Sequence, residues 1–155
     1  MGTTTFSGAI RSESTVKTIS KNATSGTITE VVTLGDGPVS LADADVTLTN
    51  ATHSGRVLLV PDGGQDNTYT LPAPIAGSVF KFVYAGGAAD ATDAIIVTPG
   101  NTNFYIGGVT FLDTDGNEVS SVFSDGNSNS SIQLNVPAGF EVTIIGLNTT
   151  NYQIF

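Results

Sequence analysis

The stretch from His53 to Tyr84 constrains the fold most, because short apolar runs alternate in it with strong turn signals. Arg56–Val60 is apolar and β-branched, and it ends at a Pro-Asp-Gly-Gly turn. Thr68–Leu71 alternates polar and apolar residues until a Pro-Ala-Pro sequence, whose prolines cannot donate ladder hydrogen bonds. Ser78–Tyr84 alternates throughout, so its aromatic residues share one face and its lysine and valines share the other. Three β-strands are therefore expected here.

Similar short runs continue on both sides of this stretch and predict an all-β fold. The further predicted strands are residues 27–34, 46–50, 94–98, 104–112, 119–123, 132–136, 140–147 and 152–155. Residues 39–45 are the only segment where a helical turn is expected, and a hairpin or bulge is expected around Gly107-Gly108. At this length a single domain is expected. We predict one antiparallel β-sandwich or jelly-roll-like domain over residues 31–155.

Residues 1–30 form a separate segment that is rich in Thr and Ser and has few apolar positions. Such spacing cannot close a core of its own. We predict an extended N-terminal arm that becomes ordered on a partner, with a disordered tail as the alternative. In the arm, Phe6 and Ile10 are the expected apolar anchors, and Arg11 and Lys17 are the expected charge contacts.

The formal net charge is −9 and is unevenly distributed, with +1 over residues 1–30 and −10 over residues 31–155. A nucleic-acid binder needs a basic surface that releases counterions, so nucleic acid is not expected as a partner. No apolar run approaches ~20 residues, and no membrane association is expected. Arg56 and Lys81 are the isolated cations of the acidic body, and each is expected to pair with an acid within the chain or across a subunit contact.

Catalytic and metal-binding patterns are largely missing. The chain has no Cys, and its one histidine, His53, has no Gly-x-Ser-x-Gly nucleophile elbow to serve. We expect His53 to cap the turn before Arg56. Two carboxylate pairs, Asp43/Asp45 and Asp113/Asp115, could act as glycosidase pairs only if a cleft held the two acids about 5–10 Å apart. Both pairs lie in turn-rich segments, where Asp is common for its turn chemistry alone.

The segment from Asp113 to Glu118 invites a calcium hypothesis. An EF-hand loop needs Gly at its sixth position, whereas Gly116 stands at the fourth and no flanking helix is expected. We predict an Asp-Gly turn between two strands, with Asp113 and Asp115 binding no metal. The chain is therefore expected to be neither an enzyme nor a cofactor-binding protein.

Residues 50–155 contain a particular order of motifs. After His-x-Gly-Arg and Thr-Leu-Pro-Ala come Ile-Ile-Val at 95–97, a Gly-Gly segment at 106–109, Ser-Ile-Gln-Leu at 131–134 and a closing hairpin. This order resembles a β-domain of tailed-bacteriophage structural proteins. The start of the chain, Thr5–Ser12, is similar to the start of phage head decoration (cement) proteins. The resemblance implies a virion protein on the outer capsid surface, made in the host cytoplasm, that clamps neighbouring major capsid protein subunits.

The resemblance and the strand pattern also suggest a homotrimer. Many short, weakly charged strands would leave open edges that a closed threefold contact could cover, with Arg56 and Lys81 near the subunit contact. The first alternative is a fibre module that binds host glycans, with Tyr69, Tyr84 and Tyr105 as candidate exposed aromatics. The second is a fragment of a carbohydrate-active or calcium-dependent enzyme.

Overall fold

We describe the fold from a computed structural model, which covers residues 16–34, 37–87, 91–113, 118–135 and 139–155. The chain divides into two compact units, residues 1–36 and residues 37–155. The described part of the first unit contains β1 (Val16–Lys21) and β2 (Ile28–Leu34), which pair antiparallel as a two-stranded sheet. The predicted boundary after residue 30 falls inside β2, because β2 pairs with β1.

The turn between β1 and β2 is built by Asn22 and Gly26. The Asn22 side chain accepts hydrogen bonds from the amides of Thr24 and Ser25, at 2.8 and 2.9 Å, which is the local geometry that favours Asn in turns. Gly26 has φ +71°, a conformation that side-chain-bearing residues adopt with strain. Residues 16–34 therefore fold back as a hairpin, rather than running on as the single extended arm that the sequence suggested.

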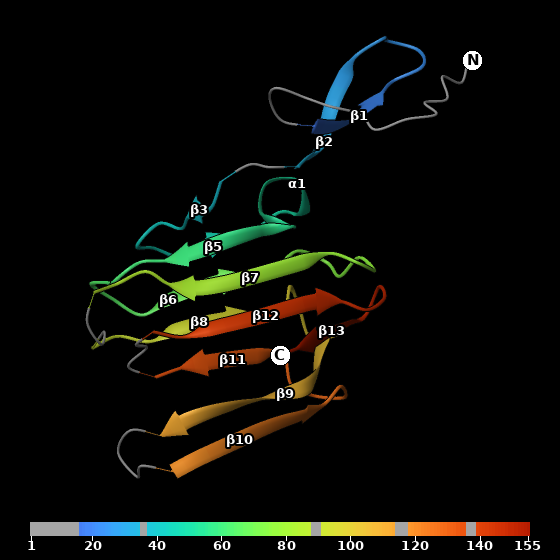
Figure 1. Cartoon of the computed structure of the whole chain (residues 1–155). Helices are drawn as coiled ribbons and strands as arrows, with labels where there is room; N and C mark the ends of the chain where they lie inside the picture. The colour runs from blue at the N-terminus through green and yellow to red at the C-terminus, as the bar shows by residue number, and fades with distance from the viewer. Residues whose placement is uncertain (1–15, 35–36, 88–90, 114–117, 136–138) are drawn as a thin grey trace, which may run out of the picture. The chain divides into compact units, whose positions relative to one another are not determined.

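Two sheets form the second unit (Figure 1). Its elements are β3 (Val39–Ser40), β4 (Val46–Thr47), α1 (Asn50–His53), β5 (Arg56–Val60), β6 (Asn67–Thr70), β7 (Val79–Tyr84), β8 (Ala94–Val97), β9 (Phe104–Asp113), β10 (Glu118–Asp125), β11 (Ser131–Leu134), β12 (Glu141–Gly146) and β13 (Asn151–Ile154). The seven-stranded sheet has the order β10-β9-β13-β12-β7-β5-β3, and the four-stranded sheet has the order β11-β8-β6-β4. The predicted all-β sandwich is confirmed.

The sheets are mixed, although the strands were predicted to be antiparallel. From β3 to β8 each strand lies in the opposite sheet from the one before it. Two successive crossings return the chain to the same sheet in the same direction, so β3, β5 and β7 pair in parallel, as do β4, β6 and β8. In Figure 1 the arrows of β5 and β7 point the same way, while β12 runs against β7. The antiparallel pairs come from the later strands.

The core lies between the two sheets. Its buried apolar side chains are Leu41, Leu48, Leu58, Val60, Tyr69, Leu71, Phe80, Phe82, Tyr84, Ala94, Ile96, Tyr105, Val142, Ile144, Tyr152 and Ile154. The predicted alternation of β7 is confirmed, because its three aromatic residues are buried and its other side chains are half-exposed. The proposal that Tyr69, Tyr84 and Tyr105 are exposed is wrong, because they are only 0, 7 and 1% exposed.

Three local predictions have clear outcomes. Residues 39–45 hold no helix: β3 lies there, and the only helical turn among the described residues is α1, which Thr49 caps. Instead of turning back at Gly107, β9 runs through it as one strand with φ +91°. The strand predicted for residues 152–155 is found as β13, and Phe155 after it exchanges backbone hydrogen bonds of 3.0 and 3.2 Å with Thr143.

Candidate functional site

The N-terminal unit carries the predicted contact residues, and the structure describes few of them. Phe6, Ile10 and Arg11 lie outside the described residues. Lys17 lies in β1, where its backbone partner is Thr33, and Lys21 ends that strand with an exposed side chain. The role of Phe6, Ile10, Arg11 and Lys17 in binding a partner therefore stays a prediction.

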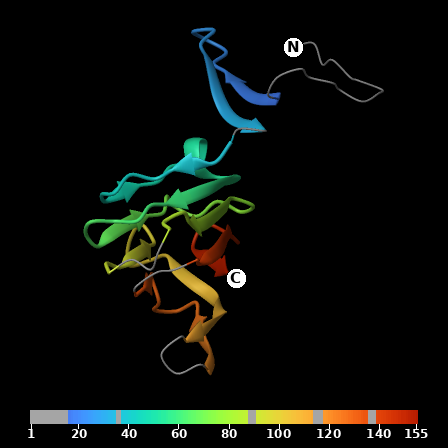
Figure 2. The ribbon, with the colours of Figure 1, turned by 60° about the vertical axis from the view of Figure 1, so that its left-hand side comes forward.

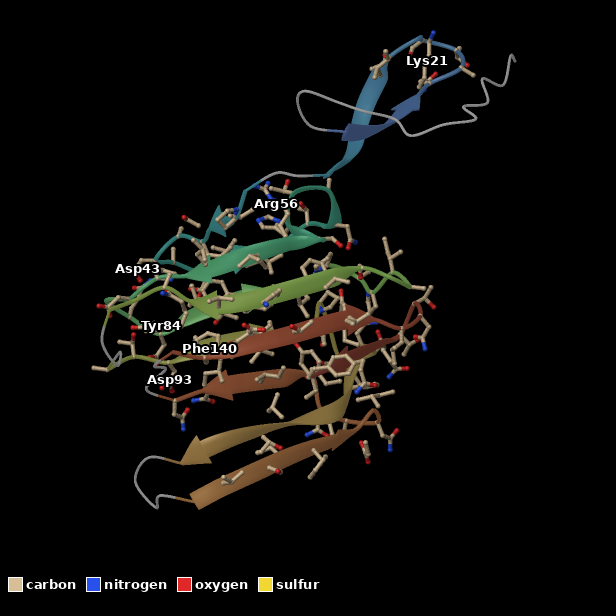
Figure 3. All side chains as sticks on the ribbon, in the orientation of Figure 1. Lys21, Asp43, Arg56, Tyr84, Asp93 and Phe140 are labelled. Atoms are coloured by element: carbon tan, nitrogen blue, oxygen red, sulfur yellow. The ribbon has the colours of Figure 1, made fainter. Side chains whose placement is uncertain are left out.

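The Arg56 side chain hydrogen-bonds to two backbone carbonyls. Its Nε and Nη2 donate hydrogen bonds to the carbonyl oxygen of Gly37 at 3.0 and 2.6 Å, and Nη1 donates to the carbonyl of Thr52 at 3.4 Å. The guanidinium thus joins the start of the second unit to the last turn of α1, next to which it lies in Figure 3. Hydrogen bonds from a charged donor are stronger than neutral ones, so these bonds order the segment that leads into β3.

Lys81 finds its acid within the chain. Its Nζ lies 2.8 Å from Glu141 Oε1, across the antiparallel pair of β7 and β12. The two side chains are 39% and 57% exposed, so the ion pair adds little stability. Arg56 and Lys81 both lie on strands inside the seven-stranded sheet. Lys81 is on the outer face of that sheet, whereas Arg56 shares the face of the buried Leu58 and Val60. A subunit contact through the two residues stays a prediction.

His53 is a capping residue, as predicted. Its Nδ1 accepts a hydrogen bond of 2.9 Å from the amide of Thr49, the N-cap residue of α1. An acceptor Nδ1 requires a neutral ring. Burial lowers the pKa of His53 below its ordinary 6.5, and the Arg56 charge lowers it further, while a contact with the Thr49 carbonyl opposes them.

We expect a pH dependence of stability that comes from His53. Since its pKa is lower in the folded state than in the unfolded state, the ring's contribution is complete above about 6.5 and declines as the pH falls below that value. The melting temperature of the wild type should therefore fall between pH 7.5 and 5.5 by more than that of His53→Gln. Superimposable pH profiles of the two proteins would show that the ring is not held neutral. His53 is the only histidine of the chain, so the comparison isolates it.

Aspartate side chains at one end of the four-stranded sheet accept hydrogen bonds from neighbouring loops and strand starts. Asp45 Oδ1 accepts from the amide of Thr68 at 2.8 Å, and Asp66 Oδ1 accepts from the amide of Asp93 at 2.9 Å. Asp43 accepts a hydrogen bond of 3.0 Å from the amide of Gly64, just before β6, and one of 2.8 Å from the side-chain amide of Asn67, the first residue of β6. Figure 3 shows Asp43 and Asp93 at the same end of the body. Asp43 and Asp45, which were weighed as a catalytic pair, thus hold protein donors.

The acidic turn predicted to join two strands falls on residues 114–117, outside the described residues. The strands that it was predicted to join do pair antiparallel, with Asp113 opposite Glu118. Within the described ranges, no three His, Asp or Glu side chains are grouped so that they could hold a metal ion. The described residues also include no helix that could cross a membrane, since α1 has only four residues.

Sequence reasoning missed a surface on β10. Val119, Val122 and Phe123 are 72, 57 and 77% exposed, although the segment was predicted to be an ordinary strand. The signal was present, because Val-Ser-Ser-Val-Phe does not alternate strictly and so cannot bury all of its apolar residues on one face.

A comparison with protein-family models gives no match, and no curated protein shows significant similarity to the chain.

Proposed function

We propose that this protein is a structural protein of a tailed-phage virion, a decoration (cement) protein that binds the outer surface of the assembled head and clamps neighbouring major capsid protein subunits. The observation that carries the proposal is the division of the chain. Among the described residues, the buried apolar side chains of the core, from Leu41 to Ile154, all belong to the second unit, and the first unit contains a separate hairpin. Since the body has a core of its own, we assign partner binding to the N-terminal unit.

The mechanism is mass action. A protein that binds only the assembled shell stabilises it by RT ln(1 + [L]/Kd), which is about 2.7 kcal/mol when the free protein is at one hundred times its Kd. If the protein is a homotrimer, three N-terminal units attach together, and the second and third attachments are intramolecular. Modest contacts by each unit then give a lasting attachment.

The proposed role is not catalytic and needs no cofactor. The aspartates considered for catalysis accept hydrogen bonds from protein donors, and His53 caps α1. A fibre module that binds glycans remains the alternative, but the tyrosines considered for it are buried. Asp43 and Asp45 give no support to the alternative of an enzyme fragment, because both accept hydrogen bonds from donors of the protein itself. A structural role therefore accounts best for these side chains.

Deleting residues 1–36 should abolish capsid binding and leave a folded protein. The deletion removes the whole first unit without cutting the β1–β2 hairpin, and it spares every residue of the core. We expect the shortened protein to be soluble, to unfold cooperatively and to stay in the supernatant when it is sedimented with undecorated capsids. The full chain should pellet with the same capsids.

A second truncation, of residues 1–15, divides the first unit further. It removes Phe6, Ile10 and Arg11 and keeps β1 and β2. Since Phe6 and Ile10 are the expected anchors and Arg11 is an expected charge contact, this variant should also fail to pellet. Capsid binding by the protein without residues 1–36 would contradict the proposed role of the first unit, and an insoluble product would show that this unit belongs to the fold of the body.

A further inference from the structure

The outer edge of β10 is the longest open strand edge among the described strands of the second unit. β10 has eight residues and ends the seven-stranded sheet, where it lies at the lower limit of the body in both Figure 1 and Figure 2. At the other sheet ends, β3 and β4 have two residues each, and β11 has four. An edge strand presents a row of unpaired N–H and C=O groups that can pair with another strand.

The central part of this edge lacks the devices that usually prevent strand pairing, and only its end residues, Glu118 and Asp125, are charged. Between Glu118 and Asp125 there is no charged residue and no proline. Val119 and Phe123 are 72% and 77% exposed, and Val122 is 57% exposed. By contrast, the outward-facing residues of β11 are Ser131 and Gln133, which are polar. β10 is therefore the described edge that combines length, exposure and apolar side chains.

We propose that β10 pairs antiparallel with β10 of a second copy of this chain, centred on Ser121. In this register Val119 of one copy lies opposite Phe123 of the other, twice across a twofold axis, and Ser120 lies opposite Val122. An aromatic residue opposite a β-branched one is a stabilising cross-strand pair. The strand is thus complementary to itself, which is the argument for a second copy as its occupant.

The neighbouring registers fit less well. Centring the pair on Val122 places Val119 opposite the carboxylate of Asp125, and centring it on Ser120 places Val119 opposite Ser121. The register centred on Ser121 also sets Glu118 opposite Ser124, so that no two carboxylates face each other. Each body carries a charge of about −10, and the contact passes through a neutral stretch where repulsion is smallest.

The chain has no cysteine, so a single introduced thiol gives an unambiguous readout. In full-length Ser121→Cys, the introduced cysteines of the two copies should lie directly opposite each other. Their Cα atoms would be about 4.5–5.5 Å apart, a distance that a disulfide can span. Mild oxidation should yield a covalent dimer on a non-reducing gel. Ser120→Cys is the matched control: its two thiols would be diagonal neighbours about 7–8 Å apart and should cross-link much less. Ser131→Cys on β11 tests by the same cross-linking whether the edge of the four-stranded sheet pairs with a second copy.

Light scattering on the wild type at micromolar concentration should give a mass of two copies or a multiple of two. Phe123→Asp, with Val122→Asp as a second variant, should weaken association at least about tenfold, which is about 1.4 kcal/mol. Circular dichroism checks that each variant stays folded. A monomer or trimer mass, the absence of a covalent dimer in Ser121→Cys, or equal cross-linking of Ser120→Cys and Ser121→Cys would overturn the pairing. Capsid binding is a separate measurement, and its failure leaves this inference untouched.

Discussion

Tyr152→Ala should lower the free energy of unfolding by about 3–5 kcal/mol. The side chain is fully buried on β13, and its ring contacts Phe80 edge-on at 6.2 Å and Tyr105 at 6.3 Å between centroids. Its hydroxyl donates a hydrogen bond of 2.8 Å to the carbonyl of Pro72. The substitution therefore leaves a large cavity between the sheets and an unpaired carbonyl. Chemical denaturation at neutral pH, with the slope compared to that of the wild type, measures the loss.

Tyr152→Phe separates the ring from the hydroxyl. It keeps both aromatic contacts and removes only the hydrogen bond to Pro72, so the expected loss is about 0.5–1.5 kcal/mol. Burial raises the pKa of Tyr152, and the hydroxyl stays a donor throughout the neutral range. Equal losses for the two variants would mean that the ring contacts do not contribute, and this would contradict the packing described above.

Gly146→Ala should destabilise the body by about 1–3 kcal/mol or more, because the space around this glycine is closed by backbone. An added Cβ would collide with the carbonyl oxygen of Ile75 and with Ser78 Oγ. Rotation of a side chain cannot relieve the first collision. Gly146 also hydrogen-bonds to the loop of residues 75–78. Its amide donates to the Ser78 carbonyl and its carbonyl accepts from the Gly77 amide, both at 2.8 Å. A shift of the loop would strain these bonds.

Gly37→Ala is the matched control for that substitution. No atom lies within 4 Å of the position where its Cβ would stand, and its φ is not in the left-handed region. The carbonyl that accepts from Arg56 is part of the backbone and is unchanged by the substitution. We expect a melting temperature within a degree or two of the wild type. A similar loss in both variants would show that the close approach at Gly146 is not the cause.

Side-chain roles were predictable where they depend on close neighbours in sequence. His53 caps a turn formed by residues 49–53, and its role follows from that local segment. The partner of Lys81 could not be named from the sequence, because Glu141 is sixty residues away and the pairing of β7 with β12 brings the two together. The exposure of Phe123 likewise depends on β10 being at the end of a sheet.

The sequence by itself determined most strands of the second unit and the alternation of side chains along them, as in β7, but not β1 or β3. Alternation and turn residues act locally, through the two-residue period of a strand and the backbone preferences of Gly, Pro and Asp. Only the tertiary structure decided which strands pair. Backbone ladder bonds are the same for every residue except proline, and the loops after β5 and β6 have turn signals that suit either a hairpin or a crossing to the other sheet. Here they cross, because burying the apolar faces of both sheets requires strands on both sides of the core. The parallel pairs and the open edge at β10 follow from that arrangement.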